Sequence, residues 1–87
     1  MAIKKLKILG ISVGDRIKAV EELQQVLTNY ADSIKTRFGF HELNQNVCSR
    51  RAIILLELAG NPNVWNDLET DLKEIEDVQV KEMTFFI

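Results

Sequence analysis

The stretch that most constrains the fold is the apolar run Arg50–Leu58, with the sequence RRAIILLEL. Between Ala52 and Leu58 only Glu57 is polar, and a Gly-Asn-Pro turn at positions 60–62 ends the run. A short apolar run without alternation is typical of a strand that is buried on both faces. A buried helix segment is the alternative, but the run is short for a helix and the turn cuts it off. The rest of the chain must therefore cover this strand.

The first part of the chain predicts a strand followed by a helix. The strand spans Lys5–Val13, and both of its faces are partly apolar because apolar residues occur at both parities. Asp15 is a suitable N-cap for a helix over Arg16–Tyr30. Residues at helical spacing form the apolar face of this helix: Ile17, Val20, Leu23, Val26 or Leu27, and Tyr30.

A second strand is predicted over Ser33–Leu43, where apolar and polar residues alternate. One face of it should point inward and the other outward, as in a strand at the edge of a sheet. The polar turn at positions 44–46 connects it to Arg50–Leu58 as a long hairpin. The inward face is expected to carry the residues of one parity: Ile34, Thr36, Phe38 and Phe40.

The last part of the chain predicts a second helix and a final strand. Asn61 is the expected N-cap and Pro62 the first helical residue. The strand covers Val78–Ile87, with Val78 and Val80 on one face and Met83 and Phe85 on the other. The apolar face of the helix consists of four residues flanked by Trp65: Val64, Leu68, Leu72 and Ile75.

The order βαββαβ predicts a ferredoxin-like α+β fold, because two right-handed βαβ units joined by a hairpin give this arrangement. The four-stranded antiparallel sheet has the order 4-1-3-2, and both helices lie on one face. A chain of 87 residues makes one such domain, over positions 1–87. The other sheet face is also apolar, so we expect self-association as a dimer or a larger homo-oligomer. The alternative is a sheet face that tolerates water and carries scattered apolar residues.

Composition and charge exclude several partners. The net charge is −2 and the pI is near 5.3, which argues against direct nucleic-acid binding. No apolar stretch approaches the roughly 20 residues that a membrane span needs, and the first residues do not form a signal peptide. The single cysteine fits a reducing cytoplasm, because it cannot form an intramolecular disulfide.

The predicted topology places a candidate ligand site where the first strand ends and the hairpin begins. Gly14 allows close approach of the backbone, and the N-terminus of the first helix favours an anion. Arginines could bind a carboxylate or a phosphate there. Alternatively, the arginines are solvated hairpin charges, some of them paired with Asp15 or Glu76. The candidate ligand-binding residues are Gly14, Asp15, Arg16, Arg50 and Arg51.

His41 and Cys48 are the strongest soft-metal ligands in the chain, and they could face each other across the hairpin. Two ligands do not fill a tetrahedral site, so a metal would need Glu42 or a second subunit. The alternative is an exposed imidazole and an unpaired thiol. No cofactor is indicated, and no catalytic constellation is complete, so the sequence predicts a protein that is not an enzyme.

The chain resembles ACT-like regulatory domains and, more closely, the small family of iron-only hydrogenase system regulators. The shared features are Val47-Cys48-Ser49 in the hairpin, IILLEL followed by Ala59-Gly60, an acidic second helix, and the last strand VQVKEMTFF. The resemblance implies a stand-alone module that regulates transcription or senses a small anionic or amino-acid-like ligand. It also implies a fold related to the metal-binding domain of nickel-responsive regulators, so metal sensing through His41 and Cys48 is the alternative function. ACT domains often carry Asp-Arg-Pro-Gly in the first loop, and here Asp15-Arg16 lacks the Pro-Gly.

Overall fold

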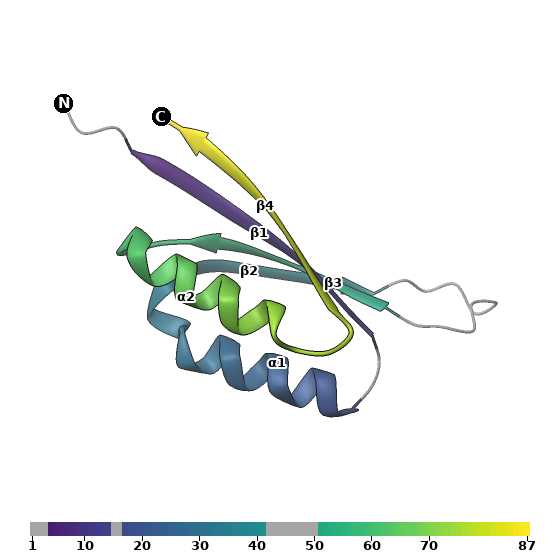
Figure 1. The fold of residues 1–87 in the computed structure, drawn as a ribbon. Helices are drawn as coiled ribbons and strands as arrows, with labels where there is room; N and C mark the ends of the chain where they lie inside the picture. The colour runs from purple at the N-terminus through teal and green to yellow at the C-terminus, as the bar shows by residue number, and fades with distance from the viewer. Residues whose placement is uncertain (1–3, 15–16, 42–50) are drawn as a thin grey trace.

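The computed structural model describes residues 4–14, 17–41 and 51–87. Four strands form one sheet, and two helices cover one of its faces (Figure 1). A single turn of 3₁₀ helix, Ala31–Ser33, leads from the first helix into the second strand. The elements are β1 (Lys5–Gly14), α1 (Ile17–Asn29), β2 (Ile34–His41), β3 (Arg51–Leu58), α2 (Pro62–Lys73) and β4 (Val78–Phe86).

The sheet has the strand order β2-β3-β1-β4, which is the predicted order 4-1-3-2 counted from the other edge. All three strand pairs are antiparallel. The ladder between β1 and β3 runs from Ile8↔Glu57 to Gly14↔Arg51. The ferredoxin-like fold and the central position of β1 and β3 are therefore confirmed.

The core lies between the sheet and the helices. Leu9, Ile11 and Val13 of β1 alternate toward the helices and are almost completely buried. Because successive strand residues point to opposite faces, the residues between them lie on the uncovered face. From the other elements, the core receives Ala19, Leu23, Leu27, Ile54, Leu56, Leu58, Trp65, Leu68, Leu72 and Ile75.

The predicted apolar face of α1 is partly wrong. Leu23 and Leu27 are buried as expected, but the Ile17 side chain is 76% exposed and Val20 is 38% exposed. The buried stripe begins instead at Ala19, four residues before Leu23. A small side chain at this position packs against the sheet, and Ile17 lies one-half turn away from that stripe, because a helix advances 100° per residue.

The second helix begins as predicted. The Asn61 side chain accepts a hydrogen bond from the Asn63 N–H at 3.0 Å, and Pro62 is the first helical residue. Trp65 is buried within the core rather than flanking it, whereas Val64 is only half-buried. The Trp65 indole N–H donates to the Ala59 carbonyl oxygen at 2.8 Å. This hydrogen bond offsets the free-energy cost of removing the N–H group from water.

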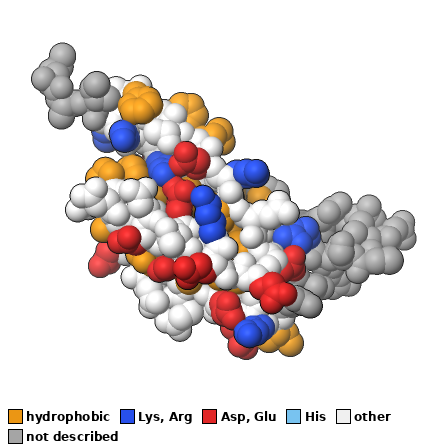
Figure 2. Space-filling view, in the orientation of Figure 1, with side chains coloured by type: hydrophobic (Ala, Val, Ile, Leu, Met, Phe, Trp, Pro, Cys, Tyr) orange, Lys and Arg blue, Asp and Glu red, His pale blue; other side chains and the backbone are white. Residues whose placement is uncertain are grey.

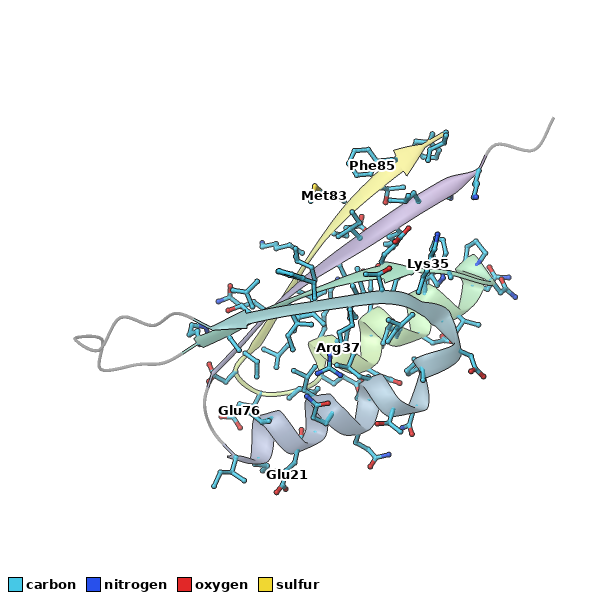
Figure 3. The ribbon with its side chains drawn as sticks, turned by 180° about the vertical axis from the view of Figure 1, so that it is seen from behind. Glu21, Lys35, Arg37, Glu76, Met83 and Phe85 are labelled. Atoms are coloured by element: carbon cyan, nitrogen blue, oxygen red, sulfur yellow. The ribbon has the colours of Figure 1, made fainter. Side chains whose placement is uncertain are left out.

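The face of β2 predicted to point inward is wrong at Phe38, which points outward. Phe38 is 61% exposed and pairs with Leu55, which lies on the uncovered sheet face. Arg37 instead lies on the helical side and donates to Gln24 of α1 at 3.2 Å (Figure 3). A register shift between Ile34 and Thr36 changes the parity of the strand, so Ile34 still packs against the core.

The uncovered sheet face is apolar. Met83 and Phe85 project from β4 on the side away from the helices, as the view from behind shows (Figure 3), and they are about half exposed. The strand β3, predicted to be buried on both faces, is buried only toward the helices, and Leu55 is 37% exposed. We call this surface the open face; its apolar residues are Leu6, Ile8, Phe38, Ile53, Leu55, Met83 and Phe85.

An ion-pair network ties α2 to the part of β1 that extends beyond β3. Lys7 contacts Glu69 of α2 and lies 2.7 Å from Glu82 of β4. Burial alone would lower the pKa of Lys7, but hydrogen bonds to both carboxylates outweigh it and raise this pKa above its usual value. The hydrogen bond from Lys7 also lowers the pKa of Glu82. Figure 2 shows the helical side of the molecule, where acidic side chains gather over the two helices.

Tyr30 connects the end of α1 to α2. Its hydroxyl donates a hydrogen bond of 2.6 Å to Asp71 Oδ2. This hydrogen bond, followed by burial and the negative charges of Asp71 and Asp67, raises the pKa of Tyr30 from 10.0 to about 12. Since the pKa is raised on folding, the contribution to stability is complete below pH 10 and is lost as the pH rises through about 12.

Tyr30 is the only tyrosine, so its titration can be followed directly by the ultraviolet absorbance of the phenolate. We expect the wild-type phenol to titrate near pH 12 and the Asp71→Asn variant to titrate closer to 10.0. Asp67→Asn is the control, because Asp67 contributes less and should move the midpoint only slightly. A wild-type midpoint near 10.0 in folded protein, confirmed by circular dichroism, would contradict the hydrogen bond.

Candidate functional site

The candidate site lies at the end of the sheet where β1 ends and β3 begins. Gly14 and Arg51 are paired across the β1–β3 ladder, so the fold brings these two predicted residues together. The turn between α2 and β4 reaches the same place, because the Gly14 N–H donates to the Asp77 carbonyl oxygen at 3.4 Å. Three segments that are far apart in the sequence therefore meet here, and we call this place the Arg51 corner.

The Arg51 guanidinium holds the corner together through four hydrogen bonds. Its Nε donates to Ser12 Oγ at 2.8 Å, and its Nη1 donates to Asp77 Oδ1 at 3.0 Å. Its Nη2 donates to the backbone oxygens of Ser12 at 3.3 Å and Asp77 at 3.1 Å. Arginine has five N–H donors in a rigid plane, so most of them are already used within the chain. The guanidinium fixes the corner and remains 35% exposed.

Asp77 has an unusual backbone conformation. Its φ is 66°, in the left-handed region that aspartate tolerates better than most residues. A side chain at Gly14 would collide with Asp77 Oδ2, so glycine at this position is required for the carboxylate to approach. The carboxylate thus lies between the backbone of Gly14 and the guanidinium of Arg51, and the corner already binds one carboxylate group.

The predicted ligand-binding residues are only partly within the described chain. Gly14 and Arg51 are adjacent, as expected. The other three, Asp15, Arg16 and Arg50, lie outside the described residues.

The predicted metal ligands cannot be placed together either. The backbone of His41 pairs with Ala52 at the end of β2, but Cys48 and the His41 side chain lie outside what is described. Within residues 4–14, 17–41 and 51–87, no group of three or more His, Cys, Asp or Glu side chains could hold a metal ion.

The sequence prediction did not include Asp77 in this site. It considered Asp15 and Glu76 as partners for the arginines, whereas the partner of Arg51 is Asp77. The position of Asp77 in the sequence could have indicated its role, because Asp is common in turns immediately before a strand and tolerates a positive φ. The turn also had to return to the start of β4, which lies beside the end of β1.

The arrangement of strands and helices defines the class of protein as one with the ACT-like, ferredoxin-like fold. The family model described as "TM1266-like: Iron-only hydrogenase system regulator, putative" matches residues 5–82. The chain belongs to this family. No curated protein is significantly similar to it in sequence. In the described part of the chain, no helix is long and apolar enough to cross a membrane.

Solved structures give the same classification. The uncharacterized protein TM1266 from Thermotoga maritima is 31% identical, with a TM-score of 0.80, and the alignment covers 94% of this chain and 99% of that one. The ACT domain from GTP pyrophosphokinase of Chlorobium tepidum has a TM-score of 0.62 at 18% identity, covering 90% and 96%. CPII from Thiomonas intermedia K12, solved with ADP, AMP and acetate, has a TM-score of 0.59 at 15% identity, covering 100% and 92%. The last two similarities concern the fold alone.

Proposed function

We propose that this protein is a non-enzymatic regulatory module that binds a small ligand as a homo-oligomer in the cytoplasm. Membership of the TM1266-like family, whose description is that of a regulator, is the observation that carries this proposal. The family model matches residues 5–82, so nearly the whole chain forms this one fold. The fold of CPII, a protein solved with nucleotides and acetate, is an example of such a scaffold.

The open face supports association between copies of the chain. Strands β1, β3 and β4 each contribute apolar residues to it, and both helices lie on the other side. Apolar patches that extend over several strands mark interaction surfaces more often than bare solvent-exposed surface. A second copy would remove this surface from water, and two subunits would also place two Arg51 corners in one assembly.

The Arg51 corner supports an anionic or amino-acid-like ligand. Asp77 shows that a carboxylate fits against the guanidinium, and the exposure of this pair leaves it within reach of solvent. A ligand carboxylate that exchanged with Asp77 would replace the side-chain contact of the turn with Arg51, while the hydrogen bonds to the Asp77 carbonyl oxygen would remain. The contact that would be lost lies one residue before β4, the strand that contributes Met83 and Phe85 to the open face.

Native mass spectrometry of protein purified from its own cell tests this proposal. We expect an assembly of at least two 10.0 kDa chains that carries additional small-molecule mass. The additional mass should be lost in the variant Arg50→Ala/Arg51→Ala and retained in Arg37→Ala, a matched arginine whose guanidinium donates to Gln24 of α1. Bare monomers in the wild type would contradict the proposed function, and retention of the mass in the double variant would contradict the site.

A further inference from the structure

A pocket lies at the opposite end of the sheet from the Arg51 corner. Its volume is about 610 Å³, within the range of roughly 300–1,000 Å³ that is usual for small-molecule sites. It opens where β1 begins, β3 ends and α2 begins, and we call it the lysine pocket. Its walls include Lys5, Leu6, Lys35, Leu58, Ala59 and Trp65.

The pocket exists because the sheet divides at this end. The ladder between β1 and β4 continues back to Lys5, but the ladder between β1 and β3 stops at Ile8. Beyond Leu58 the chain turns away from β1, because the Ala59 N–H donates to the Ser33 carbonyl oxygen at 2.8 Å. Figure 1 shows β1 and β4 extending together past the end of β3. The pocket thus lies where the two ladders of β1 end at different residues.

The floor of the pocket is apolar and belongs to the core, whereas several of the other lining residues are charged. Leu58 and Trp65 are each 4% exposed and belong to the core. The indole N–H of Trp65 is already used by the Ala59 carbonyl oxygen, so no polar atom of the ring needs a ligand. Leu58 and Trp65 expose little surface, so a ring or alkyl chain in the pocket would meet mainly the more exposed apolar residues beside them, Leu6, Pro62 and Ile87, without displacing a hydrogen bond.

The charges at the pocket are mainly positive. Lys4, Lys5 and Lys35 line it, and Glu57 is the one acidic residue among the residues that form it. Glu57 is partly neutralised, since it lies 3.8 Å from Lys35 and accepts a hydrogen bond of 3.1 Å from Thr36. No ion pair joins Lys4 or Lys5 to another described residue, but the Lys5 ammonium lies 5.8 Å from the centre of the Phe86 ring, and a ligand would have to draw it from there. Three lysines around one paired carboxylate, in a chain of net charge −2, make a local surplus of positive charge.

The geometry points to a binding site for a small carboxylic acid with an apolar body. The carboxylate would lie near the lysine amines at the rim, and the apolar body would lie over Leu58 and Trp65, beside the exposed side chains of Pro62 and Ile87. Flexible ammonium groups suit a single carboxylate because they act as point charges that follow the ligand. This inference does not use the Arg51 corner, so its failure would leave the proposed function intact.

Trp65 is the only tryptophan of the chain, so its fluorescence reports on the pocket. The probes are phenylacetate and its neutral analogue phenylacetamide, which have the same apolar body. We expect phenylacetate to change the fluorescence of Trp65 and to bind at least about tenfold more tightly than phenylacetamide, a difference of about 1.4 kcal/mol. The variant Lys5→Gln/Lys35→Gln should weaken phenylacetate binding by a similar factor and leave phenylacetamide binding unchanged.

Two further variants complete the test. Lys18→Gln is the matched control, because this lysine lies on α1 outside the pocket and its side chain is 88% exposed. Ala59→Leu should fill the pocket and abolish binding of both probes, with folding checked by circular dichroism. Equal affinity for the two probes, unchanged phenylacetate affinity in the double lysine variant, or no binding of phenylacetate tighter than about 10 mM would each overturn the inference.

Discussion

Replacing Ile54 with alanine is expected to lower the free energy of unfolding by about 2–5 kcal/mol, the range for large-to-small changes in a core. Ile54 is 7% exposed and points toward the helices, so its removal leaves a cavity that the surrounding side chains cannot fill. Leu55→Ala, one position further along β3, should cost only about 1 kcal/mol or less, because Leu55 is 37% exposed on the open face.

The two variants control for each other, because both place an alanine in the same central strand and so share its weak strand propensity. Urea unfolding followed by circular dichroism measures both. The measurement should be made at two protein concentrations, since the cost of Leu55→Ala should increase with concentration if a second copy covers the open face. Equal losses in the two variants at low concentration would show that β3 is not buried on one side only.

Phe85→Glu is expected to convert an assembly of two or more chains into monomers. A glutamate at this position would place an unpaired carboxylate from each subunit inside the proposed interface, and an isolated buried charge costs several kcal/mol. We therefore expect the dissociation constant to rise at least about a hundredfold, which corresponds to about 2.7 kcal/mol. Sedimentation equilibrium at micromolar concentration should give at least twice the chain mass of 10.0 kDa for the wild type.

Phe86→Glu is the matched control for this experiment. Phe86 is the next residue of β4 and is 66% exposed, but its side chain points to the helical side because strand residues alternate. The control variant should therefore keep the mass of the wild-type assembly. A wild-type monomer would refute self-association, whereas dissociation by both variants would indicate pairing through the edge of β4 rather than through the open face.

The strand order of the sheet could be predicted from the sequence, because few orders are compatible with the predicted elements. The run before Gly60 is short and apolar and contains two β-branched residues, which favoured a central strand over a buried helix segment. With β3 placed, the handedness of the connections left one sensible order for the other strands. The same argument predicted that one sheet face would remain apolar and uncovered, and Met83 and Phe85 occupy that face.

The errors in the prediction have specific physical causes. In α1, periodicity alone could not choose between two overlapping stripes, and the buried one uses a small residue, Ala19, that carries a weak hydrophobic signal. In β2, a shift of register near Thr36 reversed the faces of the strand, which inverted the position of Phe38. A local pattern does not specify the register of a partner strand, and it does not show which of two overlapping helix stripes faces the sheet. Neither error could therefore be avoided from the sequence.

The candidate site was predicted less completely than the fold. The pairing of Gly14 with Arg51 follows from topology, because the end of β1 lies beside the start of β3 in this fold. The contact of Arg51 with Asp77 depends on the path of a turn and on one positive φ, which no spacing rule specifies. The lysine pocket depends on where two ladders stop, and the sequence does not show that β1 and β3 separate before Ile8.

The two described ends of the chain are joined to each other. The Lys4 N–H donates to the Ile87 carbonyl oxygen at 3.3 Å, and the Ile87 N–H donates to the Lys4 carbonyl oxygen at 2.8 Å. A mechanical load that pulled these two ends apart would act on the antiparallel β1–β4 ladder from its open end. It would break the hydrogen bonds one pair after another, as in unzipping, rather than shear them all together. We therefore expect the domain to yield at lower force when pulled from these two ends than when its strands are sheared, with β4 separating from β1 before the β1–β3 ladder breaks.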